Sequence, residues 1–116
     1  MRIDGRNVVL DNTWLWHADH DDCNGASDSA YSAHALDVKG DDVTVYGLKA
    51  EHTFDHLVTW RGERGHVFMF QSELPYHKPD FSGLGYFVSN ALRSHTALGV
   101  GVYIIGELER PTAIQL

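Results

Sequence analysis

The chain has 116 residues, which suits one small domain, and its 43% hydrophobic content is typical of a folded protein. Sixteen acidic against nine basic residues give a net charge of −7, and the whole excess lies in residues 1–55, with 11 acids and 4 bases. Nucleic-acid binding and attachment to an anionic membrane surface are therefore not expected, because both need clustered Lys and Arg. No composition shift marks a linker, so we predict a single unit over residues 1–116.

Short strands are the main elements that the sequence predicts. In chain order, four segments rich in β-branched and aromatic residues are flanked by Gly, Asp or Asn: Asn7–Trp16, Val43–Leu48, His66–Phe70 and Val100–Ile105. Ala26–Leu36 has no regular helical stripe, and we expect a loop there with at most one helical turn.

A repeated pattern precedes these strands. An apolar residue, a polar residue, Gly, a polar residue, Asn or Asp, and Val follow one another in Ile3–Leu10 and Val38–Val45, more loosely in Trp60–Val67 and weakly in Val88–Leu92. We expect the glycine to adopt the left-handed conformation at a corner, where Asn or Asp can bond to its own backbone.

The spacing of the repeats indicates stacked coils. Val8, Val43, Val67 and then Leu92 recur at intervals that each exceed about 20 residues, whereas strands joined by hairpins recur about every 8–12 residues. We predict an all-β fold, a parallel β-helix of about three to four coils with the three valines in one interior column. The first interval is the longest and predicts a loop insertion near residues 21–36. The alternative is a small antiparallel sandwich.

Several blocks of the sequence resemble one family of carbohydrate-active proteins: Val9–Trp16, Ala18–His20, Val43–Leu48, Glu51–His52 and Gln71–Tyr76. The resemblance covers nearly the whole chain. It is to the pectate-lyase-like superfamily and, within it, to glycoside hydrolase family 55, the exo-β-1,3-glucanases, and to related secreted microbial proteins with discoidin-type domains. One departure is His17, where the family is expected to carry an arginine.

The resemblance implies a single-stranded, right-handed β-helix, a polysaccharide substrate and an extracellular location. The N-terminal residues do not look like a signal peptide, so the residues alone fit a cytosolic protein equally well. Members of the family are several times longer than this chain, which is therefore expected to be a fragment.

Glu73 is the first candidate for a catalytic carboxyl group. Glycoside hydrolysis uses two carboxyl groups, one of which carries a proton, and apolar neighbours at the end of an apolar strand would favour the protonated form. Gln71 and Ser72 could orient a water molecule, and Tyr76 could stack on a sugar ring. The alternative is that Glu73 only bonds to a neighbouring turn.

Glu51 and Asp19 are the other catalytic candidates. Glu51 precedes Glu73 by close to one coil, so we expect these two carboxylates on one face, joined by Asp19 across the inserted loop. Equivalent positions on adjacent coils lie about 4.8 Å apart. The alternative is three solvated acids at coil ends. Three further residues complete the predicted substrate-binding set: His20, His52 and Trp60.

Two other features leave their roles open. Trp14 and Trp16 alternate on one strand and must share a side, either the interior or a sugar-binding groove. The stretch His17–Cys23 has the composition of a metal site but the spacing of no standard ligand motif, and we predict neither a metal nor a cofactor. Cys23, the only cysteine, lacks an evident His/Asn relay for a nucleophile.

The predicted function is that of part of a glycoside hydrolase acting on a β-glucan by carboxylate acid/base catalysis. A non-catalytic sugar-binding or structural β-helix fragment is one alternative. A polysaccharide lyase is another, disfavoured because no basic residue joins the acidic motifs to neutralise a uronate. The predicted partner is a polysaccharide or oligosaccharide, and open coil ends predict self-association.

Overall fold

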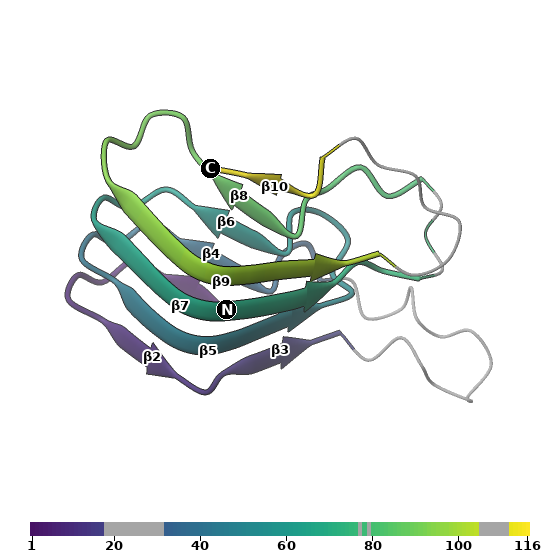
Figure 1. Cartoon of the computed structure of the whole chain (residues 1–116), viewed down its shortest axis with the longest axis horizontal. Helices are drawn as coiled ribbons and strands as arrows, with labels where there is room; N and C mark the ends of the chain where they lie inside the picture. Colours follow the sequence, from purple (N-terminus) through teal and green to yellow (C-terminus); the bar gives the residue numbers. More distant parts are fainter. Residues whose placement is uncertain (18–31, 77, 79, 105–111) are drawn as a thin grey trace.

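The computed structural model describes residues 1–17, 32–76, 78, 80–104 and 112–116. These residues form two parallel sheets that face each other (Figure 1). The first sheet has the order β1 (Arg2–Ile3), β4 (Leu36–Val38), β6 (Val58–Trp60), β8 (Tyr86–Val88) and β10 (Ile114–Gln115). The second stacks β2 (Val9–Asp11) and β3 (Trp14–Trp16) on β5 (Thr44–Glu51), then β7 (Gly65–Glu73) and β9 (His95–Tyr103).

The chain passes from one sheet to the other and back, and each pass stacks on the one before it. Ile3 pairs with Val38 in the first sheet, and Val38 in turn pairs with Trp60. In the second sheet, Val45 pairs with Val67. Every strand pair in the described residues is parallel, which confirms the all-β parallel prediction and excludes the antiparallel sandwich.

The second sheet bends at the same place on every strand. The predicted strand Asn7–Trp16 is broken there, because Asn12 has a φ of 49° and separates β2 from β3. The residues at the equivalent place in β5, β7 and β9 also have positive φ: Gly47 at 60°, Met69 at 65° and Gly99 at 68°. Strands β5, β7 and β9 continue past the bend. Each of them therefore has a first half before the bend and a second half after it.

Gly40 and Gly62 of the repeat are needed for close stacking, not for a left-handed conformation. A Cβ atom on Gly40 would lie 1.8 Å from the carbonyl oxygen of Gly5, and one on Gly62 would lie 1.8 Å from that of Gly40. None of these three glycines has a positive φ, so the predicted role is wrong. The left-handed residues lie two positions later and are Asn7, Asp42 and Arg64, with φ of 56°, 57° and 55°.

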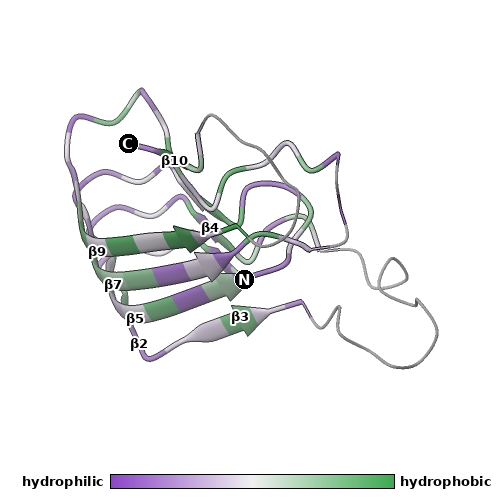
Figure 2. Cartoon of the chain, turned by 45° about the vertical axis from the view of Figure 1, so that its right-hand side comes forward, coloured by the Kyte–Doolittle hydropathy of each residue, from purple (hydrophilic) through white to green (hydrophobic). Residues whose placement is uncertain are grey.

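The core lies between the sheets and is almost entirely apolar. Figure 2 shows hydrophobic and hydrophilic residues alternating along β5 and β7, so that one face of each strand points inward. The fully buried side chains include Val43, Val45, Leu48, Leu57, Val58, Trp60, Val67, Phe70 and Tyr86.

The predicted valine column is only partly right. Val43 and Val67 are buried, but Val67 pairs with Val45, which pairs with Leu10 on the other side. The third repeat has Gly65 in the place of Val43, and a Cβ there would lie 2.4 Å from the Trp60 ring. The Trp60 ring thus fills the space that Val43 fills one coil earlier. As a result, the valine of the third repeat is Val67, two positions after the residue equivalent to Val43.

A neutral polar pair lies at the last coil of the core. Tyr86 is buried, and its hydroxyl lies 2.9 Å from His95 Nε2. Burial lowers the pKa of His95 to about 4 and raises the pKa of Tyr86 above its ordinary range. His95 is therefore uncharged at neutral pH, and its hydrogen bond with the tyrosine hydroxyl satisfies a polar group of each residue inside the core.

One sequence-based expectation lies mostly outside the described residues. The predicted insertion near residues 21–36 falls mostly on residues 18–31, outside the described residues, although Leu36 already begins β4. The described part of the chain contains no helix long and apolar enough to cross a bilayer.

Candidate active site

Two carboxyl groups lie side by side on the outer surface of the second half of the second sheet. Glu51 in β5 pairs with Glu73 in β7, which confirms that these two residues share one face. Trp16 continues the column below Glu51, and Tyr103 continues it above Glu73. We call this surface the carboxylate face; its outward residues are Trp14, Trp16, Lys49, Glu51, Gln71, Glu73, Gly101 and Tyr103.

Glu51 is covered by the two tryptophans. The Trp14 indole donates a hydrogen bond from Nε1 to Glu51 Oε2 over 3.0 Å, and the Trp14 and Trp16 rings stack with centroids 5.7 Å apart. Glu51 is only 7% exposed, whereas Trp14 and Trp16 are 59% and 47% exposed. The tryptophans therefore lie on the surface, and the interior alternative for this pair is excluded.

Glu73 is held by polar groups, not by the apolar neighbours that the sequence suggested. The Tyr76 hydroxyl donates to Glu73 Oε2, and Gln71 Nε2 donates to Oε1 over 3.4 Å. His52 Nε2 lies 3.7 Å from Glu73 Oε2, and its ring packs edge-on against Tyr76 with centroids 4.4 Å apart. The expected apolar surroundings are wrong because the chain turns at Leu74 and brings Tyr76 back over the carboxyl group.

His52 supports the site from below. It follows β5 directly, has a φ of 62° and is only 1% exposed. Its backbone N–H donates to the Glu73 carbonyl over 3.1 Å, which fixes the end of β7. In this structure His52 contacts Glu73 and Tyr76 and presents almost no surface to a substrate.

Two predicted substrate-binding residues point into the core. Ser72 lies between Gln71 and Glu73 on β7, so side-chain alternation turns it inward, and it is fully buried between Ala50 and Val102. Trp60 is also fully buried and donates from Nε1 to the Gly62 carbonyl over 3.0 Å. Ser72 cannot orient a water molecule on the carboxylate face, and Trp60 cannot form a sugar platform.

Asp19, His20 and Cys23 lie outside the described residues, so the third predicted carboxylate has no described position. His17 is the one described member of the metal-like stretch. It is 8% exposed, its backbone N–H donates to the Glu51 carbonyl over 3.1 Å, and its ring packs against Phe54 with centroids 4.9 Å apart.

The comparison with known families decides which proteins this chain is related to. Residues 1–73 match the family model described as the LAM55 pectate lyase-like domain. The chain belongs to this family. The match includes both Glu51 and Glu73, and it confirms the resemblance to glycoside hydrolase family 55.

Known LAM55 relatives are much longer than this chain. An exo-beta-1,3-glucanase of Streptomyces sp. (strain SirexAA-E / ActE) is 31% identical over 112 residues, which cover 87% of this chain and 18% of the relative. A solved glutamate-to-alanine variant of sacteLam55A from Streptomyces sp. SirexAA-E, in complex with glucose, matches with a TM-score of 0.82 and 28% identity over 89% of this chain and 20% of that one. A second sacteLam55A structure matches with a TM-score of 0.78 and 28% identity, over 89% of this chain and 23% of the other. The chain thus spans about a fifth of the length of these relatives.

Two large side chains of the carboxylate face, those of Lys49 and Tyr103, were missed by the sequence reasoning, as was Gly101. Lys49 Nζ lies 5.7 Å from the centre of the Trp14 ring, and Tyr103 continues the carboxylate column and is 57% exposed. Lys49 could have been found two positions before Glu51 by side-chain alternation, and Tyr103 could have been found one coil after Glu73. Tyr103 was not evident from the sequence because the coil between Glu73 and Tyr103 is longer than the coil between Glu51 and Glu73.

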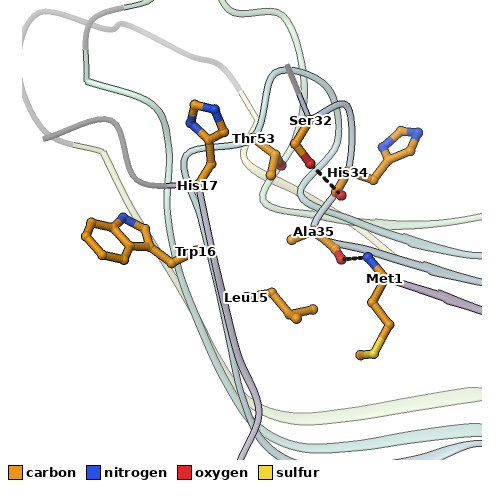
Figure 3. A pocket seen from close by; sticks show the side chains of 8 residues that line it. All are labelled: Met1, Leu15, Trp16, His17, Ser32, His34, Ala35 and Thr53. Carbon is orange, nitrogen blue, oxygen red and sulfur yellow. Dashed lines mark hydrogen bonds between the residues drawn. The ribbon is translucent and has the colours of Figure 1, made fainter. Parts of the chain in front are cut away.

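A cavity of about 210 Å³ lies near the start of the LAM55 chain (Figure 3). Its lining contains Trp16 but neither carboxylate, and the N-terminal amine of Met1 donates to the Ala35 carbonyl at its edge over 2.7 Å. The other lining residues are Leu15, His17, Ser32, His34 and Thr53. The cavity therefore adjoins the tryptophan side of the carboxylate face without being part of it.

Proposed function

We propose that this LAM55 chain is part of a glycoside hydrolase that cleaves β-1,3-glucan with Glu73 and Glu51. The observation that carries the proposal is the pairing of these two residues on adjacent strands of an exposed face with stacked tryptophans. The name of the Streptomyces relative, an exo-beta-1,3-glucanase, supports the choice of substrate.

The contacts of the two carboxyl groups suggest a different catalytic role for each. Glu73 is the more exposed, with 27% of its side chain accessible, and in its protonated form it donates the proton to the glycosidic oxygen as the bond to the leaving sugar breaks. Tyr76 and Gln71 hold it in place for this transfer. Glu51, fixed by the Trp14 N–H, positions water or substrate beside it.

Asp19 remains a third catalytic candidate, and His20 remains a candidate for substrate binding beside it. Both precede the predicted insertion. The order Trp16, His17, Asp19 places them in sequence directly after the strand that carries the tryptophans.

Non-catalytic sugar binding is the second candidate function, and the stacked, exposed Trp14 and Trp16 favour it. One experiment separates the two. The chain is incubated with a soluble β-1,3-glucan, and with a β-1,4-glucan as control, while released sugar and binding are both measured. We expect release from the β-1,3-glucan only. Binding without release supports the non-catalytic function, and the absence of both contradicts the proposal.

We further propose that the two sheets form one right-handed β-helix of three to four coils with an insertion near residues 21–36. The handedness is supported by the general rule that about 98% of parallel crossover connections are right-handed. An extracellular location is proposed from the resemblance to secreted polysaccharide-degrading proteins.

Self-association is the expected behaviour of the isolated chain. The interior side chains of the first and last strands are only partly buried, among them Leu10 and Leu15 at one end and Val100 and Val102 at the other. Among the described residues, the outer edge of β9 has no strand paired with it and offers its backbone groups to another strand. We expect the mass measured by light scattering to rise with protein concentration. A monomer at every concentration would contradict this expectation.

A further inference from the structure

A hollow of about 280 Å³ lies on the carboxylate face between β7 and β9. It is separate from the cavity near Met1 and from the tryptophan side of the face. Its lining residues are Met69, Phe70, Gln71, Gly99, Val100, Gly101 and Tyr103.

The hollow exists because one outward position has no side chain. Trp14 pairs with Lys49 and Lys49 with Gln71, so each coil adds a large side chain to this column until Gly101 follows opposite Gln71. A Cβ atom on Gly101 would meet Tyr103 Cε2 at 3.9 Å and the Phe70 oxygen at 4.0 Å, both ordinary contacts. The backbone therefore does not require glycine here, and its effect is to leave space.

The walls of the hollow suit a neutral sugar. The residues that line it carry no charged side chain. Met69 and Tyr103 are 58% and 57% exposed and offer an apolar surface and an aromatic ring. The Gln71 amide supplies donors and an acceptor for hydroxyl groups, an apolar wall with a few polar groups being the usual composition of a small-ligand site.

The hollow also lies next to the proposed catalytic group, which is not itself part of the lining. Gln71 lines the hollow and donates to Glu73 Oε1 over 3.4 Å. The two residues are two positions apart on β7, about 6.6 Å at roughly 3.3 Å per residue, which is comparable to the length of one sugar unit. Tyr103 stands opposite Glu73 and borders both places.

We propose that this hollow is a binding subsite for an uncharged sugar unit next to the unit held at Glu73, and that Gly101 is the residue that opens it. The inference rests on the proposed function. It adds the direction of the bound chain, which runs from Glu73 along β7 towards the bend at Met69.

The test compares ligands of two lengths on a chain that cannot cleave them. In the Glu73→Gln background, calorimetry measures the Kd of glucose and of a β-1,3-linked glucose pentamer, with a galacturonate tetramer as the anionic probe. Gly101→Leu fills the hollow. Thr96→Leu is the matched control, because Thr96 points outward on the same strand but lies in its first half, beyond the bend.

We expect the pentamer to bind at least tenfold more tightly than glucose, and Gly101→Leu to abolish this advantage while leaving the glucose Kd unchanged. Thr96→Leu should change neither value. Gly101→Ala, which adds only the Cβ atom, replaces the leucine variant if that variant does not fold. It should reduce the pentamer's advantage over glucose by a smaller factor.

An unchanged pentamer preference in the filled variants overturns the subsite, as does pentamer binding no tighter than glucose binding. Stronger binding of the galacturonate tetramer than of the pentamer overturns the assignment to an uncharged sugar unit. A chain with the native Gly101 that binds neither glucose nor the pentamer would overturn the proposed function as well.

Discussion

Glu73→Gln should reduce the hydrolysis of β-1,3-glucan by about 10²–10⁴-fold, the usual contribution of a general acid, without lowering stability. An amide has nearly the shape of a carboxyl group and can still accept the hydrogen bond from Tyr76, but it cannot deliver a proton. The measurement is kcat/KM on glucan, together with a thermal melt of the same sample.

Two comparisons make the result specific to proton donation. An aryl glucoside with a very acidic leaving group should lose far less activity in Glu73→Gln, because such a group departs with little protonation. Glu51→Gln should not show this recovery if Glu51 positions water or substrate. Glu63→Gln, a change of the same type at a corner carboxylate, is the control and should leave hydrolysis unchanged. Unchanged hydrolysis in an active Glu73→Gln protein would move the proton donor to Glu51 or Asp19.

Gly40→Ala should have a large effect on stability. The added methyl group would lie 1.8 Å from the Gly5 carbonyl oxygen and 2.7 Å from its carbonyl carbon, and these atoms cannot shift easily because they belong to the backbone. Overpacking of this kind costs about 3 kcal/mol or more, against a total stability of about 5–15 kcal/mol for a domain. We expect the melting temperature to fall by on the order of 10–20 °C, or the chain to be unfolded.

Gly5→Ala is the matched control for this stacking effect. Its Cβ atom would meet only Val8 Cγ2, at an ordinary 3.5 Å. The loss of melting temperature should therefore be small, and circular dichroism of both variants checks it. Equal losses in Gly5→Ala and Gly40→Ala would show that intrinsic strand or turn preference, not the close approach of successive coils, requires glycine at these corners.

Stacking of the strands could be predicted because the sequence repeats recur at intervals of about one coil. Glu51 and Glu73 lie one repeat apart in the sequence and pair directly, as the repeat indicated. The position of the left-handed residues could not be predicted, because the pattern contains both a glycine and an Asn or Asp, and either can adopt that conformation. Only the stacked coils show that the glycine gives room to a carbonyl oxygen.

Only part of the candidate site could be predicted, because side-chain direction follows from strand alternation but contacts made after a turn do not. Ser72 could have been assigned to the interior by alternation with Glu73, whereas Trp60 could not, since every residue of β6 is buried and the strand has no alternating pattern. The surroundings of Glu73 were missed because they come from Tyr76, which reaches it only after a change of chain direction at the end of β7. Turns of that kind have no clear signal in a single sequence.

The strands keep their register although the chain between them varies in length. Ile3, Val38, Trp60 and Val88 lie in one column, yet the first of the three intervals between them is the longest and the second is the shortest. Length changes are thus absorbed entirely at the corners, while Glu51 and Glu73 remain one strand apart. In evolution, such a scaffold can acquire or lose loops around a fixed pair of carboxylates, so substrate range can diverge by insertion and deletion while the strands that hold the acid groups are inherited intact. The same property would let an engineer exchange corner loops between relatives without redesigning the core.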